Sequence, residues 1–224
     1  MPTKHLVSIA TYDAPAQGAG GLAWDGTHLW LADFRVKTLL RLDAATLTVQ
    51  RQLPSQGTPG GLTWDGRLLW QAVFGAGVAV GLDPETGHVQ RRAVLPENQG
   101  LVRIAGLAWD GTYLWCGSQQ DGLLYAVDVP EETVSRSLSL LAPLGGVAWD
   151  GQHFWVGGAS GLHWNGQSWI DEGQPVYQLL KLDPEEGKAL DHYSLAYWPM
   201  GLAWDGSWLW VSDSQHSKLH QIAV

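Results

Sequence analysis

The sequence is poor in the residues that several classes of protein require. Its one cysteine, Cys116, cannot form an internal disulfide, which excludes a disulfide-stapled fold and fits a reducing compartment. Lys and Arg together number 13 against 22 Asp and Glu, for a formal net charge of −9. Because no basic cluster offers a surface for a phosphate backbone, we expect no nucleic-acid partner.

Long apolar runs and helical periodicity are also missing. No segment is long enough to cross a membrane, and the first residues, MPTKHLVSIATYDAP, lack the apolar run of a signal peptide. We therefore expect a cytoplasmic protein with no membrane partner. Since no stretch sustains a helical period, a helical fold is excluded as well.

Glycine and tryptophan, by contrast, are abundant, with 28 and 14 residues. They recur in five copies of a sequence motif such as GLAWDGTHLW, in which a second tryptophan lies six positions after the first. The first tryptophans are Trp24, Trp64, Trp109, Trp149 and Trp204, and the second are Trp30, Trp70, Trp115, Trp155 and Trp210. A later aspartate follows in the first four copies, at Asp43, Asp83, Asp128 and Asp183.

The spacing between these residues gives a repeat of 40 residues. From the second tryptophan to the later aspartate the gaps are 13, 13, 13 and 28 residues. From that aspartate to the next first tryptophan they are 21, 26, 21 and 21. The regular unit therefore carries one insertion of 15 residues and one of 5.

Each unit contains the local signals of four β-strands. Asp-Gly between two short apolar runs predicts one hairpin, and a turn such as Asp-Pro-Glu-Thr-Gly at 83–87 predicts another. Four strands in every 40 residues indicate an all-β fold, a closed five-bladed β-propeller with four antiparallel strands per blade. We expect the ten paired tryptophans to fill the core between the blades.

We expect the five blades to form a single domain, residues 1–224, and the protein to be a monomer. Counting also predicts how the ring closes, because KLHQIAV at the end of the chain falls on the third strand of blade five. The segment HLVSIATYDAP near the start then supplies the fourth strand of that blade. The expected blades are about 21–60, 61–105, 106–145, 146–200, and 201–224 together with 1–20.

The longer insertion contains GLHWNGQSW, residues 161–169, a shortened echo of the repeat. Its Asn165-Gly166 pair is typical of a two-residue turn, so we expect an added hairpin at about 158–174 in blade four. Loops after the second and fourth strands of a blade open on one face of the ring. The shorter insertion, around 97–105, therefore lies on the same face, where elaborated loops favour a functional site.

Two aspartates are candidates for chemistry on that face. Asp33 and Asp213 occupy equivalent positions in blades one and five, which are neighbours across the closure. Together they could bind a divalent cation such as calcium, or act with His216 as acid and base. The alternative is that each carboxylate caps its own loop through backbone N–H groups.

Aromatic side chains suggest a ligand pocket nearby. The insertion contributes His163, Trp164 and Trp169, and the loop into blade five contributes Tyr197 and Trp198, an aromatic wall for a sugar or another small organic ring. The alternative is that the hairpin tryptophans fold back onto the ring. Further candidates in the loops of this face are Arg35, Phe74 and Gln119, of which Arg35 could hold a carboxylate or phosphate or be an ordinary surface residue.

The repeat GLAWDGxxLWLAD…LLRLD resembles the blade of several bacterial propeller groups over essentially the whole chain. The glutaminyl cyclases (glutamine cyclotransferases) have the same number of blades, and NHL, YncE-like and gluconolactonase-like propellers are looser relatives. In LWQAVFG, Gln71 stands where the resemblance to the cyclases would place a glutamate. The resemblance to gluconolactonases, which hold calcium with Glu, Asn and Asp, rests on Asp33 and Asp213.

Two functions follow as expectations. The first is a propeller that binds a small molecule. If it is an enzyme, we expect a metal-assisted hydrolase or lyase of the lactonase or phosphotriesterase type, and not a glutaminyl cyclase. The second is a non-catalytic platform that binds a protein or glycan through the inserted hairpin.

Overall fold

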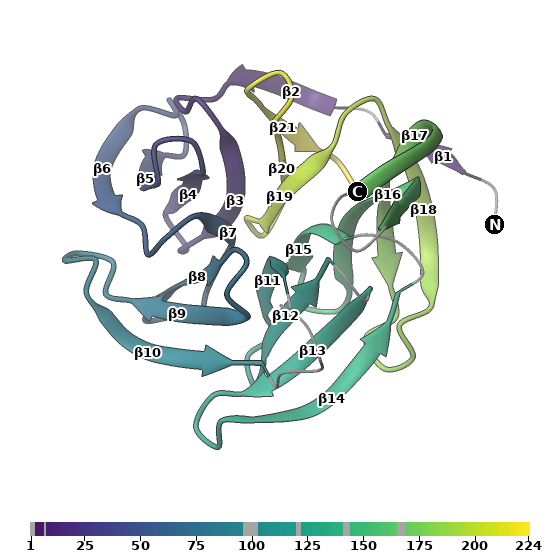
Figure 1. Cartoon of the computed structure of the whole chain (residues 1–224). Helices are drawn as coiled ribbons and strands as arrows, with labels where there is room; N and C mark the ends of the chain where they lie inside the picture. The colour runs from purple at the N-terminus through teal and green to yellow at the C-terminus, as the bar shows by residue number, and fades with distance from the viewer. Residues whose placement is uncertain (1–2, 7, 96–102, 120–121, 141–143, 165–168) are drawn as a thin grey trace.

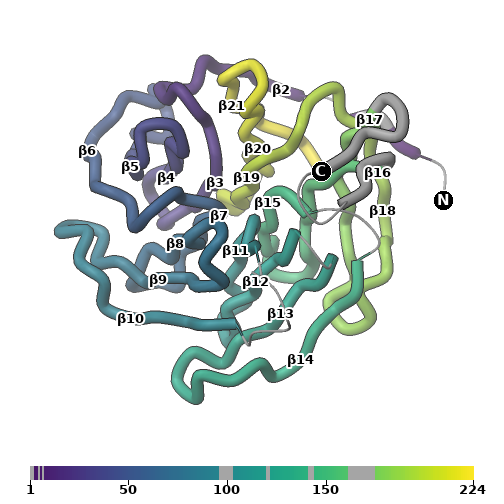
Figure 2. Tube along the Cα trace, in the orientation of Figure 1, coloured from purple at the N-terminus to yellow at the C-terminus, as the bar shows by residue number. Residues whose placement is uncertain are grey.

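The computed structural model describes residues 3–6, 8–95, 103–119, 122–140, 144–164 and 169–224, without the side chains of His5, 161–164 and 169–174. Strands arranged in five sheets surround a common axis (Figure 1). The path of the chain runs once around this ring (Figure 2). Within the described ranges, no helix is long and apolar enough to cross a membrane.

Each blade is an antiparallel sheet whose first strand lies innermost. Blade one consists of β3 (Ala19–Trp24), β4 (His28–Asp33), β5 (Thr38–Asp43) and β6 (Val49–Pro54). Blade two consists of β7 (Pro59–Trp64), β8 (Leu69–Val73), β9 (Val78–Leu82) and β10 (Val89–Val94). Blade three consists of β11 (Ile104–Trp109), β12 (Leu114–Ser118), β13 (Leu123–Asp128) and β14 (Thr133–Ser139).

Blades four and five depart from this plan in different ways. Blade four contains β15 (Leu144–Trp149), the long β16 (Phe154–Trp164) and β17 (Trp169–Leu182), and β18 (Ala189–Leu195). Blade five contains β19 (Pro199–Trp204), β20 (Leu209–Asp213), β21 (Lys218–Ile222) and β2 (Ser8–Asp13). The predicted closure is confirmed, because β2 pairs antiparallel with β21 and so joins the two ends of the chain in one sheet.

The Asp-Gly turn after each first strand explains why the repeat contains its tryptophans. In blade three, Oδ1 of Asp110 accepts the N–H groups of Thr112 and Tyr113, each at 2.7 Å. Oδ2 of the same carboxylate accepts the indole N–H of Trp115 at 2.6 Å. Gly111 has φ of +99°, where a side chain would be strained. The other four blades repeat this arrangement, with Asp–indole distances of 2.7–2.9 Å.

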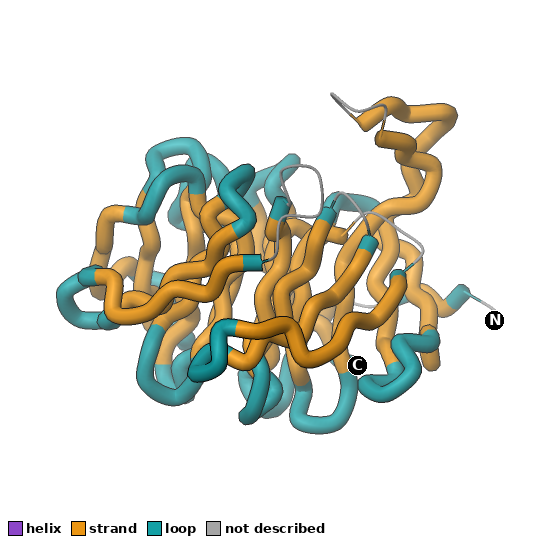
Figure 3. Tube along the Cα trace, turned by 60° about the horizontal axis from the view of Figure 1, so that its bottom comes forward, coloured by secondary structure: helices purple, strands orange, loops and turns teal. Residues whose placement is uncertain are grey.

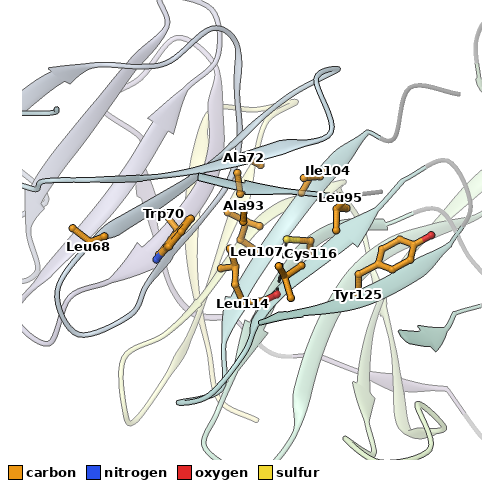
Figure 4. Close-up of a cluster of buried hydrophobic side chains, with 12 residues drawn as sticks. Leu68, Trp70, Ala72, Ala93, Leu95, Ile104, Leu107, Leu114, Cys116 and Tyr125 are labelled. Carbon is orange, nitrogen blue, oxygen red and sulfur yellow. Dashed lines mark hydrogen bonds between the residues drawn. The ribbon is translucent and has the colours of Figure 1, made fainter. Parts of the chain in front are cut away.

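The two tryptophans of a repeat have different surroundings. All five second tryptophans are at most 2 % exposed and belong to apolar clusters between blades. Figure 4 shows one such cluster, whose members include Trp70, Leu107 and Cys116, and burial raises the pKa of the Cys116 thiol. The first tryptophans are only partly buried at the cluster margins. The second tryptophan of each pair thus lies in the core as expected, whereas the first is only partly buried there.

The first strands of neighbouring blades approach each other closely at glycine. A Cβ atom on Gly61 would lie 2.6 Å from the backbone N of Leu107, and one on Gly146 would lie 2.6 Å from that of Leu202. At the closure, a Cβ on Gly201 would collide with the carbonyl oxygen of Gly20. The invariant glycine of the GLAWDG phrase is therefore a requirement of the narrow five-fold ring.

The N-terminal segment makes a contact that counting did not predict. Before it reaches blade five, β1 (Lys4–His5) pairs in parallel with β18 at the outer edge of blade four. The Lys4 ammonium forms an ion pair with Asp191 and lies 5.6 Å from the ring centroid of Tyr193. The segment thus crosses from one blade to the next on the outside of the ring.

The longer insertion extends the two middle strands of blade four. β16 and β17 continue beyond a register shift between Ser160 and Leu162, and pair as far as Trp164 with Trp169. The resulting hairpin projects from one face of the ring (Figure 3), which we call the insertion face. The opposite face, which carries the turns after first and third strands, is the turn face. The expected Asn165-Gly166 turn and most of the shorter insertion, 96–102, lie outside the described residues.

Candidate functional site

The insertion face has a hollow of about 320 Å³ where blades four and five meet. Blade three contributes one residue and the base of the inserted hairpin contributes two. The lining consists of Gln119, Pro175, Tyr177, Trp198, Met200, Ser214 and Gln215. No Lys, Arg, Asp or Glu is among these described lining residues, so the hollow suits an uncharged ligand.

Contacts among the lining residues fix the walls of this hollow. The side-chain amide of Gln215 donates to the Tyr177 hydroxyl at 3.0 Å, and its oxygen accepts the backbone N–H of Trp198 at 3.0 Å. The rings of Tyr177 and Trp198 meet edge to face, with centroids 6.0 Å apart and an interplanar angle of 85°. The indole N–H of Trp198 lies 3.3 Å from Sδ of Met200. One glutamine therefore connects the two aromatic walls.

Some of the residues expected to bind a ligand come together here. Trp198 and Gln119 line the hollow, whereas Tyr197 stacks on His220 with ring centroids 4.1 Å apart. Burial, assisted by the charge of Asp213, raises the pKa of Tyr197, whose hydroxyl therefore stays protonated. The side chains of His163, Trp164 and Trp169 lie outside the described part of the structure.

Two other candidates lie on different blades. Phe74 follows β8 and is covered by Arg103, whose guanidinium lies 5.9 Å from the ring centroid. Arg35 follows β4, and its side chain packs over Gly18. Neither residue lines the hollow at blades four and five.

Sequence reasoning missed Tyr177, which is the hydrogen-bond partner of Gln215. Tyr177 lies on β17 just after the inserted hairpin, paired with Leu195 of β18. A signal existed, because Tyr177 comes three residues after the end of the expected hairpin at about 158–174. The residue spacing predicted the insertion, but not the position at which its two strands continue into the blade.

Asp33 binds two loops of the insertion face, its own loop after β4 and the loop that precedes β3. Its side chain is 2 % exposed, and Oδ2 accepts the N–H of Gln17 at 2.8 Å. Oδ1 accepts the N–H groups of Gly18, Arg35 and Val36 at 3.0–3.3 Å. A carboxylate that accepts four backbone N–H groups has few lone pairs left for a metal ion.

Asp213 accepts two backbone N–H groups, from Gln215 at 2.9 Å and His216 at 3.1 Å. Its Oδ2 also lies 2.6 Å from Nδ1 of His216. Among the described residues, no group of three or more His, Cys, Asp or Glu side chains is placed to hold a metal. The residues present therefore do not fit the calcium ion that the sequence suggested.

Two histidines flank Asp213 in different environments. The side chain of His216 is 64 % exposed, whereas Asp213 beneath it is 2 % exposed. His220 is buried, with Nδ1 3.0 Å from the Thr11 hydroxyl and Nε2 3.9 Å from Oδ2 of Asp213. Burial lowers the pKa of His220, against the opposing effect of Asp213, so its imidazole favours the neutral form.

Gln71, the residue that departs from the cyclase pattern, has a defined role in blade two. Its side chain is fully buried, and its amide N–H donates to the carbonyl of Gln56 at 2.8 Å. Its side-chain oxygen accepts the N–H of the same Gln56 at 3.0 Å. An ionised carboxylate could accept but not donate, so at neutral pH this pair of bonds requires the amide.

Comparison with known proteins bears on the fold. The crystal structure of a glutaminyl cyclase from Myxococcus xanthus matches with a TM-score of 0.74 and 14 % identity, over 99 % of this chain and 97 % of that one. A chain in the crystal structure of a mitotic checkpoint complex matches with a TM-score of 0.58 and 16 % identity, over 100 % of this chain and 97 % of that one. No family model and no curated protein matches the sequence. The protein is thus a five-bladed β-propeller arranged like the glutaminyl cyclase, a likeness of fold.

Proposed function

We propose that the protein binds a small uncharged ligand with both hydroxyl groups and an apolar face, such as a sugar, in the hollow on the insertion face. Its volume of about 320 Å³ lies within the range of ~300–1,000 Å³ typical of small-molecule sites. The Tyr177 and Trp198 rings offer apolar faces, while Gln119, Ser214 and Gln215 offer hydrogen bonds. Uncharged walls favour such a ligand over an ion.

The observation that carries this proposal is the double hydrogen bond of Gln215. By donating to Tyr177 and accepting from Trp198, its amide holds both aromatic walls in one geometry. A site whose side chains are already ordered loses less conformational entropy on binding. Pre-ordered aromatic and amide groups around an open hollow support recognition rather than packing alone.

Saturation-transfer NMR and calorimetry with a panel of neutral mono- and disaccharides test the proposal. A Trp198→Ala variant should weaken any sugar bound by the wild type at least ~10-fold, because it removes one aromatic wall. Trp208→Ala is the matched control, since Trp208 is 38 % exposed on the turn face. Binding that Trp198→Ala leaves unchanged, or the absence of binding across the panel, would contradict it.

A second candidate function is metal-independent acid–base hydrolysis by the Asp213–His216 pair. The 2.6 Å contact places a buried carboxylate on Nδ1 of an exposed imidazole, which is how a general base is oriented. A panel of esters, lactones and phosphotriesters tests it. Turnover that survives a chelator but falls at least ~100-fold in His216→Asn supports this function, and turnover unchanged in that variant contradicts it.

A further inference from the structure

A second hollow lies on the outer side of the ring, where blades two and three meet. Its volume is about 380 Å³, and we call it the rim notch. The outermost strand of blade two, β10, forms one wall, and the turn between β13 and β14 of blade three forms the other (Figure 1). The lining residues are Val89, Gln90, Arg91, Arg92, Val129 and Glu132. None of these residues lines the hollow on the insertion face.

At two other junctions, an arginine of the outermost strand holds a carboxylate of the next blade. Arg51 of β6 forms an ion pair with Glu85 at 2.5 Å, and Arg41 of β5 reaches the same carboxylate at 2.6 Å. Arg136 of β14 forms an ion pair with Glu185 at 3.0 Å. Both glutamates lie in the turn between the third and fourth strands of their blade. This contact therefore joins blade one to blade two, and blade three to blade four.

The junction at the rim notch has the arginine but not the glutamate. Arg91 stands in β10 where Arg51 stands in β6, because each comes eight residues after the aspartate that opens the preceding turn. In the facing turn of blade three, Pro130 stands where blade two has Glu85, two residues after the first aspartate of the turn. Proline has no carboxylate, so the turn of blade three cannot supply this ion pair.

The turn of blade three otherwise follows the same plan. Its flanking strands pair in the same register as those of blade two. The positive φ of +73° at Gly87 recurs at the equivalent Glu132, with +54°. The substitution by Pro130 therefore removes a carboxylate from an unchanged frame.

Arg91 accordingly faces solvent. It is exposed, whereas Arg51 and Arg136 are half-buried against their glutamates. Among the described residues, none forms an ion pair with Arg91 or Arg92. The lining of the rim notch thus has two guanidinium groups against the single carboxylate of Glu132. A carboxylate from outside the chain could take the place that Glu85 has at the neighbouring junction.

The strand that carries Arg91 also has an open edge. Among the described strands, β10 pairs only with β9, so one row of its backbone N–H and C=O groups has no strand beside it. Blade four shows how such an edge is used, because β1 pairs in parallel with β18. Asp191 stands in β18 where Arg91 stands in β10, and it forms an ion pair with Lys4 of the added strand. A charged residue at this position thus holds an added strand of opposite charge.

We propose that the open edge of β10 binds an extended acidic segment of a partner protein. The segment pairs with β10 through its main chain, and one Asp or Glu carboxylate reaches Arg91 in the rim notch. A second copy of this chain does not fit, because its own β10 would bring like charges together and its Lys4 has the same sign as Arg91.

Two-dimensional NMR titrations of the whole chain with the peptide TVEVT, blocked at both ends, test the proposal. The amide shifts should saturate along β10. The peptide should bind at least ~5-fold more tightly than its counterpart TVQVT, because only a carboxylate pairs with Arg91. Equal binding of the two peptides, or shifts that saturate elsewhere, would overturn the proposal without any variant.

A second pair of probes separates strand pairing from charge. TVEVT with N-methyl groups on the glutamate and on the valine before it loses one N–H donor on each edge but keeps its carboxylate. This peptide, and the single blocked residue N-acetylglutamate amide, should each bind at least ~5-fold more weakly than TVEVT. If either binds as tightly as TVEVT, the site holds a free carboxylate and the strand pairing is refuted.

Variants then locate the carboxylate. Arg91→Gln should bring the binding of TVEVT to within ~2-fold of that of TVQVT. Arg51→Gln, at the same position of blade one, is the matched control and should leave the preference intact, because Arg51 is already engaged by Glu85. An unchanged preference in Arg91→Gln would contradict the role of Arg91.

The facing turn offers an independent test. Pro130→Glu restores the carboxylate that the turns of blades two and four have, so it should compete for Arg91 and weaken TVEVT binding ~5-fold. Pro130→Gln removes the proline without adding a charge and should keep the binding of the wild type. Equal effects of the two substitutions would show that the rim notch does not select a carboxylate.

Discussion

The two faces of the ring differ in how they use the repeat. On the turn face every blade has the same Asp-Gly turn, and each Asp holds its turn and its tryptophan in the same way. On the insertion face the residues at the equivalent position of the second strands differ from blade to blade: Asp33, Val73, Ser118, Gly158 and Asp213. The repeated contacts of the turn face specify the fold. On the insertion face the blades differ in sequence, so an asymmetric hollow can form there.

The largest expected effect comes from the buried tryptophans. Trp115→Ala should lower the free energy of unfolding by about 3–5 kcal/mol, because it leaves a cavity and an unpaired Asp110 carboxylate oxygen. Trp109→Ala, in the same repeat but partly exposed, should cost roughly 1–2 kcal/mol. Urea unfolding measures both, and equal losses would show that the two tryptophans are equivalent after all.

Replacing the buried amide of blade two should have the next largest effect. Gln71→Glu places a carboxylate opposite the carbonyl of Gln56, and should cost about 3 kcal/mol at pH 7. The cost should shrink toward pH 4, because a protonated acid can donate to that carbonyl. Gln50→Glu on the exposed outer strand is the control and should stay within roughly 0.5 kcal/mol. A Gln71→Glu variant as stable as the wild type would refute the role assigned to the amide.

Weakening one turn should cost less. Asp110→Asn keeps an acceptor for the turn but presents a weaker, uncharged partner to the indole of Trp115, so we expect a loss of about 1–2 kcal/mol. Asp128→Asn should cost less, because the Asp128 carboxylate accepts the backbone N–H of Glu131 at the longer distance of 3.2 Å. The comparison would fail if the two substitutions had the same effect on the denaturation midpoint.

The smallest effect concerns pH on the insertion face. Burial lowers the pKa of His220 in the folded protein below its usual value near 6.5, so the unfolded chain binds the proton more readily. The contribution of His220 to stability is therefore full above pH 6.5 and is lost as the pH falls through the folded pKa. The urea midpoint of the wild type should fall between pH 7.5 and pH 5, and in the His220→Gln variant this fall should be smaller. An unchanged slope would contradict this.

The spacing of the repeated residues predicted the five-bladed ring, because each blade is specified by local turn sequences and by the alternation of its strands. The Asp-Gly turns, the paired tryptophans and the position of the insertion all follow from spacing. The parallel pairing of Lys4 with Tyr193 does not follow from spacing, because a strand of two residues is too short to show an alternating pattern. Nor does spacing predict that the oxygens of Asp33 accept backbone N–H groups from two loops, because hydrogen-bond partners depend on loop geometry rather than on residue type.

The N-terminal segment also acts as an edge cover. Residues 4–5 occupy the outer edge of β18, and residues 8–13 occupy the outer edge of β21, so one short stretch hides two rows of unpaired backbone groups. Proteolytic removal of that stretch would expose both edges at once, side by side on neighbouring blades. Exposed edges template pairing with other chains, so a trimmed protein would be prone to strand exchange between copies and to aggregation.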